Sequence, residues 1–326
     1  MIHRTRLTPE AFDPEGGAPD LARLNRHLLD EHARRPDPWS VTVQQARQAR
    51  LEGKGIFPPA RPDPDTALRS VPVPGAPDVP VRVIAPKTRK ARGTYIHIHG
   101  GGWLFGQAIE ADPRLRALAE TTGLATVSID YRLAPENPFP AAFDDCLAVA
   151  RAVLDGSMGL PTGFMAIGGE SAGAHLSVVT LLRLRSEDGA TPFHAANLVA
   201  GFYDLGLTPS ARDTSTPRII INAEDLTRFV TLSLPEGANR RDPLYSPLYV
   251  DLSGLPPARL SCGSRDPLRH DTLFMAQVWA DAGNEAELCV TTGGCHVFEA
   301  FGTPSGVASL AAADAWLADR IGVVDP

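Results

Sequence analysis

The sequence has no stretch that could cross a membrane and no recognisable export signal. Nowhere in the 326 residues do about 18 apolar residues follow one another, as a membrane-spanning helix would need. The segment Met1–Arg6 is polar and is followed by Pro9, Glu10 and Asp13, so it lacks the apolar core of a signal peptide. We therefore expect a cytoplasmic protein with no membrane partner.

Features of nucleic-acid-binding and metal-binding proteins are also missing. The net charge is −7, and no basic stretch alternates with aromatic residues, so nucleic acid is not an expected partner. The four cysteines show no Cys-x-x-Cys spacing; they are Cys146, Cys262, Cys289 and Cys295. Free thiols in a reducing compartment are the simplest interpretation, and we expect neither a metal site nor a cofactor.

Strands and helices alternate regularly from about residue 90 to the end of the chain. Apolar runs typical of buried strands occur at 94–99, 125–130, 164–167, 195–202, 258–262 and 286–291. Helical periodicity separates or follows them at 115–121, 141–154, 174–184, 272–282 and 307–321. Upstream, 71–74 and 79–84 alternate as edge or antiparallel strands do. This order predicts the α/β class, with a mainly parallel central sheet and helices on both faces.

Two regions do not fit that alternation. Amphipathic helices are expected at 21–35 and 41–51, and residues 205–240 form a mixed stretch with one helical patch. Because ligands bind beyond the carboxyl ends of the strands in such sheets, both regions are candidates for a helical cap there. We expect an N-terminal part of the cap at 1–50, an α/β core at 51–204 and 241–326, and a cap insertion at 205–240.

The stretch Gly169-Glu170-Ser171-Ala172-Gly173 fits the G-x-S-x-G pattern of a nucleophile elbow. An apolar run precedes it and a helical segment follows it, so Ser171 is expected on a sharp strand-to-helix turn. The flanking glycines avoid a clash in so tight a bend, or supply a positive φ. The free N–H groups of the next helix favour an oxyanion near Ser171. The alternative is a glycine-rich turn with an inert serine.

A second glycine-rich segment, His99-Gly100-Gly101-Gly102-Trp103, follows another expected strand. Three consecutive glycines let backbone N–H groups approach a substrate oxygen closely, as an oxyanion hole requires. The alternative is a flexible glycine loop, which is disfavoured by its position after a strand and before the elbow.

A carboxylate and an imidazole complete the order serine, aspartate, histidine. Asp266 comes just after the strand at 258–262, and Asp271 is the competing acid. Each of these carboxylates could instead serve a turn or a helix N-terminus. Of the nine histidines, His296 alone combines a preceding strand, a glycine-led loop and the expected chain order.

These segments resemble the hormone-sensitive-lipase-like family (bacterial family IV) of carboxylesterases in the α/β-hydrolase superfamily. The likeness runs from about residue 70 to the end. It also includes Asp-Tyr-Arg-Leu-Ala-Pro-Glu at 130–136, Asp266-Pro267-Leu268, and the stretches 246–248 and 251–257 that lead into the acid-bearing strand. The resemblance implies the α/β-hydrolase fold with a helical cap.

The resemblance also implies a role for each motif residue. Ser171 would be the nucleophile, His296 the general base and then acid, and Asp266 the group that orients the histidine. The oxyanion N–H groups would come from Gly101, Gly102 and Ala172. The supporting residues would be His99, which braces the glycine loop, with Gly100, Gly169, Gly173 and Glu170, the last standing where aspartate is more usual.

Some neighbouring residues are left with alternatives. Cys295, an uncommon residue before the histidine, could make activity sensitive to oxidants or alkylating agents. Five aromatic residues next to the motifs are candidates for the substrate pocket and equally for the core: Trp103, Phe105, Phe202, Tyr203 and Phe298.

The resemblance and the compact cap point to hydrolysis of short- to medium-chain carboxylic esters through an acyl-serine intermediate. The same groups could act on amides, thioesters or lactones. A non-catalytic small-molecule receptor, like the plant gibberellin receptors, is a further alternative, although receptors of that kind lack the late histidine. Relatives often pair through a terminal strand or helix, so a homodimer is also expected.

Overall fold

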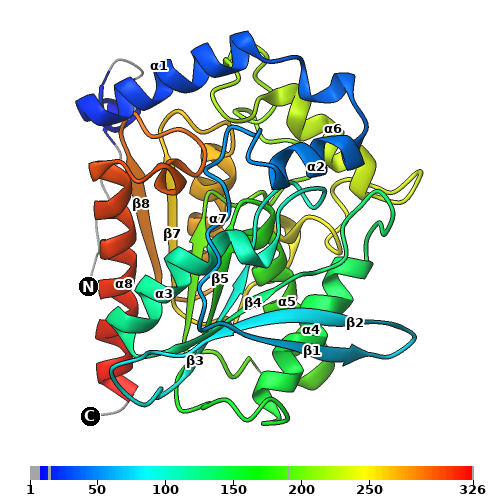
Figure 1. Ribbon diagram of the computed structural model, residues 1–326, viewed down its shortest axis with the longest axis vertical. Coiled ribbons are helices and arrows are strands. Elements are labelled where there is room, and N and C mark those ends of the chain that lie inside the picture. The colour runs from blue at the N-terminus through cyan, green and yellow to red at the C-terminus, as the bar shows by residue number, and fades with distance from the viewer. Residues whose placement is uncertain (1–7, 14–15, 190, 325–326) are drawn as a thin grey trace.

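An eight-stranded sheet runs through the molecule in the order β1-β2-β4-β3-β5-β6-β7-β8 (Figure 1). The computed structural model describes residues 8–13, 16–189 and 191–324. The strands are β1 (Ala67–Val73), β2 (Ala76–Ile84), β3 (Thr94–Ile98), β4 (Ala125–Ile129), β5 (Met165–Glu170), β6 (Ala195–Val199), β7 (Ala258–Gly263) and β8 (Ala286–Thr291). The β1–β2 and β2–β4 pairs are antiparallel and the other five pairs are parallel, which confirms the predicted sheet.

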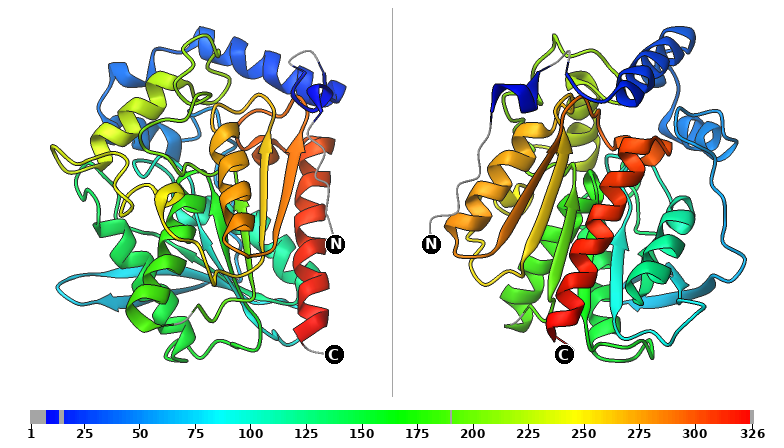
Figure 2. Two further views of the ribbon diagram at one scale, coloured as in Figure 1. Left: turned by 180° about the vertical axis from the view of Figure 1, so that it is seen from behind. Right: turned by 90° about the vertical axis from the view of Figure 1, so that its left-hand side faces the viewer.

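Helices cover both faces of this sheet. They are α1 (Pro19–Arg34), α2 (Val43–Leu51), α3 (Asp112–Thr122), α4 (Ala141–Leu154), α5 (Ala172–Asp188), α6 (Ala223–Ser233), α7 (Arg269–Asp281) and α8 (Pro304–Val324). Short 3-10 turns are η1 (Pro9–Phe12), η2 (Pro38–Ser40), η3 (Ala108–Ala111), η4 (Pro247–Tyr249) and η5 (Phe298–Phe301). Figure 2 shows α3 and α8 on one face and α4, α5 and α7 on the other.

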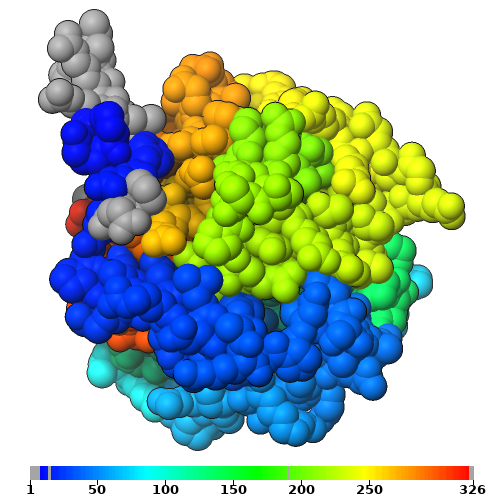
Figure 3. All heavy atoms as spheres, turned by 90° about the horizontal axis from the view of Figure 1, so that it is seen from above, coloured from blue at the N-terminus to red at the C-terminus, as the bar shows by residue number. Residues whose placement is uncertain are grey.

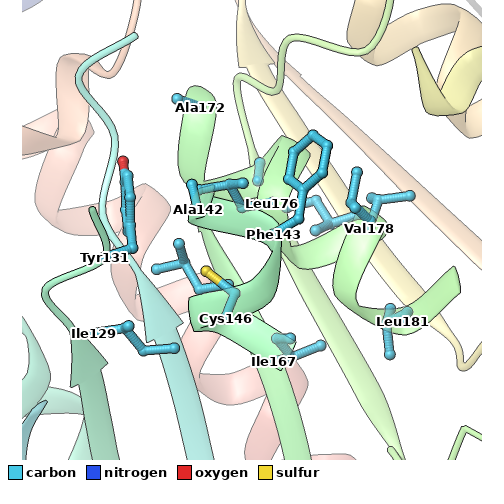
Figure 4. Packing of buried hydrophobic residues seen from close by; sticks show 14 of the residues in the cluster. Ile129, Tyr131, Ala142, Phe143, Cys146, Ile167, Ala172, Leu176, Val178 and Leu181 are labelled. Atoms are coloured by element: carbon cyan, nitrogen blue, oxygen red, sulfur yellow. The ribbon is translucent and has the colours of Figure 1, made fainter. Parts of the chain in front are cut away.

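The alternation of side chains along the buried strands supplies both faces with apolar surface. In β3, Ile96 and Ile98 join the cluster under α4 and α5, whereas Tyr95 joins the cluster under α3 and α8. In Figure 4, Ile129 and Ile167 from the sheet lie near the Phe143, Cys146 and Leu176 side chains of α4 and α5. Each large apolar side chain buried in this way contributes about 1.5–3 kcal/mol, so the sheet is a rigid base for the loops at its edge.

Some predicted element boundaries need correction. β6 ends at Val199 and not at residue 202, because the chain turns away at Ala200, whose φ is 50°. β1 and β2 are longer than predicted and form a hairpin that starts at Ala67. The prolines and charged residues of this hairpin hid its full length from the apolar pattern.

The two regions that break the strand–helix alternation lie together beyond the carboxyl ends of the parallel strands. Figures 1 and 3 show α1 and α2 beside the segment that carries α6. Leu21, Leu24 and Leu28 of α1 form one apolar cluster with Ile219 and Ile220 of that segment. This placement is where a cap was expected, while the division of the chain into cap and core stays a prediction.

Within the residues that the structure describes, none of the helices combines the length and apolar character needed to cross a bilayer.

Candidate active site

Ser171 lies at the turn between β5 and α5, after the last residue of the strand and before the first of the helix. Its backbone has φ 56° and ψ −117°, a conformation that costs a non-glycine residue of order 1–3 kcal/mol and that the surrounding packing must hold. A Cβ on Gly169 would lie 2.0 Å from the carbonyl oxygen of Ile98, and one on Gly173 would lie 1.9 Å from it. This close approach requires the two glycines. The positive φ belongs to Ser171 and to neither glycine.

His296 connects Ser171 to Asp266 through its two ring nitrogens. Nε2 lies 2.9 Å from the Ser171 Oγ, and Nδ1 lies 3.0 and 2.9 Å from the Asp266 Oδ1 and Oδ2. Because an ionised carboxylate only accepts, Nδ1–H donates to Asp266, which leaves Nε2 to accept the Ser171 hydroxyl proton. Ser171, His296 and Asp266 are only 7%, 4% and 0% exposed, so water competes little for these contacts.

The competing carboxylate, Asp271, is in α7 and makes different contacts. Its Oδ1 accepts from the backbone N–H of Tyr203 and Asp204 at 2.8 and 2.9 Å, and its Oδ2 accepts from the Thr208 hydroxyl at 2.6 Å. Burial raises the pKa of Asp271 to about 7, although these hydrogen bonds act in the opposite direction. Of the two carboxylates, the structure therefore brings Asp266 to the histidine, whereas Asp271 holds the chain that follows β6.

The glycines after β3 differ in whether their N–H groups have a hydrogen-bond acceptor. The Gly100 N–H donates to Glu170 Oε1 at 2.7 Å and is therefore already used. Gly101 and Gly102 have φ of 119° and 62°, and no oxygen in the described part of the chain accepts a hydrogen bond from their N–H groups. Ala172 begins α5, where an N–H has no acceptor within the helix. N–H groups without an acceptor therefore lie both in the glycine loop and at the start of α5, next to Ser171.

Two side chains hold the glycine loop, His99 at the Gly100 carbonyl and Glu170 at the Gly100 N–H. The His99 Nδ1 lies 2.8 Å from the Gly100 carbonyl oxygen, and the His99 ring stacks on Tyr131 with centroids 4.3 Å apart. Glu170 Oε2 also contacts the His97 Nε2 at 3.1 Å. Burial alone would raise the pKa of Glu170, but His97 and the Gly100 N–H lower it below its usual value. Glu170 therefore acts as a carboxylate that fixes the loop beside the elbow.

Four of the five aromatic pocket candidates are core residues. Trp103, Phe202, Tyr203 and Phe298 are each at most 1% exposed, and Trp103 stacks on Phe202 with centroids 5.4 Å apart. This burial favours the core alternative for these four residues. Phe105 is half-buried and remains a candidate.

Two aromatic residues that sequence analysis missed approach the site from α6 and η2. Phe229 of α6 packs against Gly102, where an added Cβ would lie 2.5 Å from its ring. Trp39 of η2 contacts Phe105 and Phe229, with ring centroids 6.3 and 5.8 Å apart, and its Nε1 donates to Asp225 of α6 at 2.7 Å. No local pattern marks either residue, because their neighbours come from distant parts of the chain.

The burial of Cys295 argues against a reactive thiol at this position. The side chain is 1% exposed and lies in the apolar cluster that α1 forms with the loop after β8. Burial raises the pKa of Cys295 to about 12, so the nucleophilic thiolate is scarce at neutral pH. The side chains of α1 and of residues 219–220 thus shield the residue that precedes the histidine.

The assembled groups fit acyl transfer. A nucleophile–base contact, a base–carboxylate contact and unused backbone donors next to the nucleophile are the parts that such a reaction needs. Across 8–13, 16–189 and 191–324, no group of three His, Cys, Asp or Glu side chains is arranged to hold a metal ion.

Comparison with known proteins agrees with this geometry. The model of the alpha/beta hydrolase fold family matches residues 95–300. Carboxylesterase NlhH of Mycobacterium tuberculosis is 32% identical over 85% of this chain and 88% of that protein. An acetyl-hydrolase of Streptomyces hygroscopicus is 35% identical, but the match covers only 58% of this chain and 62% of that protein.

Solved structures give the same result. An esterase of the bacterial hormone-sensitive lipase family has a TM-score of 0.80 at 29% identity, covering 94% of this chain and 99% of that one. The hyperthermophilic esterase of Pyrobaculum calidifontis has a TM-score of 0.82 at 27% identity, covering 93% and 98%. The chain belongs to the α/β-hydrolase fold family and, within it, to the hormone-sensitive-lipase-like carboxylesterases. The fold class and the family resemblance predicted from the sequence are confirmed.

Proposed function

We propose that this chain is a serine carboxylesterase that hydrolyses short- to medium-chain carboxylic esters through an acyl-serine intermediate. The observation that carries the proposal is the pair of contacts from His296 to Ser171 and to Asp266. Relatives named carboxylesterase and acetyl-hydrolase support a small ester as the substrate.

Acylation begins with the Ser171 hydroxyl. Its Oγ attacks the ester carbonyl carbon while the proton passes to His296 Nε2, which is already 2.9 Å away. The imidazolium that forms is stabilised by Asp266, which also keeps the ring in the required tautomer. The tetrahedral intermediate then collapses, the alcohol leaves with the proton from Nε2, and Ser171 is left acylated.

Deacylation repeats these steps with water. His296 Nε2 takes a proton from the water as its oxygen attacks the acyl carbon, and then returns that proton to the Ser171 Oγ. In both halves the negative charge on the carbonyl oxygen is met by the N–H groups of Gly101, Gly102 and Ala172. Preorganised donors of this kind are each worth about 10²–10³-fold in turnover.

We also propose which residues form the cap and which form the catalytic core. Residues 51–204 and 241–326 would form the catalytic core, and 1–50 with 205–240 would form the cap. The contacts of Trp39 with Phe229 and Asp225 support this division, because they join the two cap regions to each other above the glycine loop.

The homodimer and the cytoplasmic location also remain proposals. The far edge of β8 has no strand partner in the described part of the chain, which supports pairing of two copies there.

The test is turnover of p-nitrophenyl esters of graded acyl length by the wild type and by Ser171→Ala. We expect an optimum at short to medium acyl chains and a loss of several orders of magnitude in the variant. Activity that survives in Ser171→Ala would contradict the mechanism. A wild type that is silent on every ester but cleaves amides, thioesters or lactones would favour those relatives, and ligand binding without turnover would favour a receptor.

A further inference from the structure

The backbone of the glycine loop is strained and needs external support. Gly101, Gly102 and Trp103 have φ of 119°, 62° and 62° in succession. For a tryptophan this conformation is strained, and it persists only where the surroundings hold it. Two of the three N–H groups that the proposed mechanism uses, those of Gly101 and Gly102, lie inside this run, so their direction depends on what holds the loop.

Backbone hydrogen bonds hold part of the glycine loop, both within the segment and to the turn at 133–136. The Gly101 carbonyl accepts from the N–H groups of Leu104 and Phe105 at 3.2 and 2.9 Å. The Trp103 carbonyl accepts from the Ala134 N–H at 3.0 Å. These bonds tie the glycine loop to the turn at 133–136, but they leave the Leu104 carbonyl without a backbone partner in the described part of the chain.

The side chain of Arg47 supplies a partner for the Leu104 carbonyl. Arg47 of α2 donates from Nε to the Leu104 carbonyl at 2.7 Å and from Nη2 to the Ala134 carbonyl at 2.5 Å. Its Nη1 and Nη2 also lie 3.0 and 2.9 Å from the Glu136 carboxylate oxygens. Among the described residues, no other side chain donates to a carbonyl of residues 101–105. The guanidinium therefore joins the glycine loop to the turn beside it.

The shape of the guanidinium suits this position. It presents several N–H donors in one rigid plane, so a single group can hold two carbonyls and a carboxylate at fixed directions. Glu136 is itself oriented by Gln44 of the same helix, whose Nε2 lies 2.6 Å away. Although burial would raise the pKa of Glu136, its contact with Arg47 keeps that pKa below the usual value.

We propose that Arg47 is a positioning residue for the oxyanion loop, through which the cap helix α2 sets the directions of the Gly101 and Gly102 N–H groups. The inference rests on the proposed esterase function. Arg47 contacts the Leu104 carbonyl, directly after the glycine loop, and acts on the reacting atoms only through that loop. Its loss therefore weakens stabilisation of the transition state more than it weakens binding of the ester.

Arg50 is a matched control in the same helix. Arg47 and Arg50 side chains are both 23% exposed, and each pairs with a glutamate. The partner of Arg50 is Glu110 of η3, at 2.6 Å, so this pair fastens α2 to the core without touching a carbonyl of the glycine loop. Arg50→Met removes a comparable ion pair and comparable packing.

The experiment compares Arg47→Met with Arg50→Met on p-nitrophenyl butyrate, well below both melting temperatures. In Arg47→Met, the misplaced glycine loop is expected to lower kcat by about 10- to 100-fold, while KM stays within about twofold. Arg50→Met should keep the kcat of the wild type. Arg47→Lys should recover part of the loss, because an ammonium can hold one carbonyl but not both in a fixed plane.

A transition-state analogue separates positioning from general destabilisation. An alkyl trifluoromethyl ketone forms a tetrahedral oxyanion on the serine, so its inhibition constant should rise in Arg47→Met by the factor that kcat/KM falls. Equal kcat values for the two methionine variants, or an unchanged inhibition constant, would overturn the inference. If Arg47→Met does not fold, Arg47→Lys beside Arg50→Lys carries the same comparison, and equal kcat values again overturn it.

Wild type and Ser171→Ala are measured in the same series. A silent wild type would mean that the proposed function has failed. An active wild type and an inactive Ser171→Ala, with Arg47→Met equal to Arg50→Met, would mean that only the role of Arg47 has failed.

Discussion

The sheet and the helical segments that we propose as its cap hold the proposed functional residues in different ways. In the core, Ser171, Asp266 and His296 follow β5, β7 and β8, and the pairing of parallel strands brings these ends to one edge of the sheet. In the proposed cap, Arg47 and Phe229 reach the same edge from helices outside the sheet, and side-chain contacts hold them there. We therefore expect the core to determine whether the chemistry occurs and the cap to adjust its rate and substrate range.

The largest effect should separate two buried carboxylates of the core. Asp266→Asn removes the group that holds the His296 tautomer, so kcat should fall by about 10³–10⁴-fold. Asp271→Asn should leave kcat within about twofold, because an amide oxygen can still accept from Tyr203 and Asp204 while its NH₂ faces the Thr208 hydroxyl. Steady-state kinetics on p-nitrophenyl butyrate measures both.

Thermal unfolding of the same two variants provides the control. Both should stay folded at the assay temperature, since each substitution conserves size. A large loss of kcat in folded Asp271→Asn with little loss in Asp266→Asn would show that the wrong acid was assigned.

A smaller effect is expected from the cap. Phe229→Ala removes the ring that covers Gly102 and contacts Trp39, and so opens space beside the glycine loop. Extra methylene groups of the substrate can fill that space, so the preference for octanoate over butanoate should rise by about tenfold. The ratio of kcat/KM values for the two p-nitrophenyl esters measures this change.

Phe193→Ala is the matched control for Phe229→Ala. Phe193 is 6% exposed and Phe229 is 8% exposed, but Phe193 precedes β6 at the opposite end of the sheet. Both substitutions should lower stability by about 3–5 kcal/mol, and Phe193→Ala should not alter the ester preference. If Phe193→Ala changed the ester preference as much as Phe229→Ala does, the proposed difference between cap and core would be contradicted.

The difference between the regions also explains how much could be predicted from the sequence. The parallel sheet, the elbow and the order Ser171, Asp266, His296 could be predicted because each is a local pattern of strand, turn and helix. Asp266 and Asp271 could not be separated from the residues alone, because both come soon after the same strand. Contacts across the fold distinguish them.

The cap contacts could not be predicted in the same way. Arg47 and Trp39 lie in segments whose periodicity indicates only helices and turns, and their partners are distant in the chain. For the same reason, the sequence left two alternatives, pocket and core, for aromatic residues beside the motifs such as Phe202 and Tyr203. Closeness along the chain to a motif does not show whether a side chain points to the site or into the core.

The account's central claim is that Ser171 is the activated nucleophile. Diethyl p-nitrophenyl phosphate phosphorylates a serine that an adjacent base activates, and peptide mass spectrometry locates the adduct. We predict inactivation with one adduct, on the peptide that carries Ser171, and no adduct on Ser171→Ala. Inactivation with Ser171 unmodified and the adduct on another residue would contradict the account.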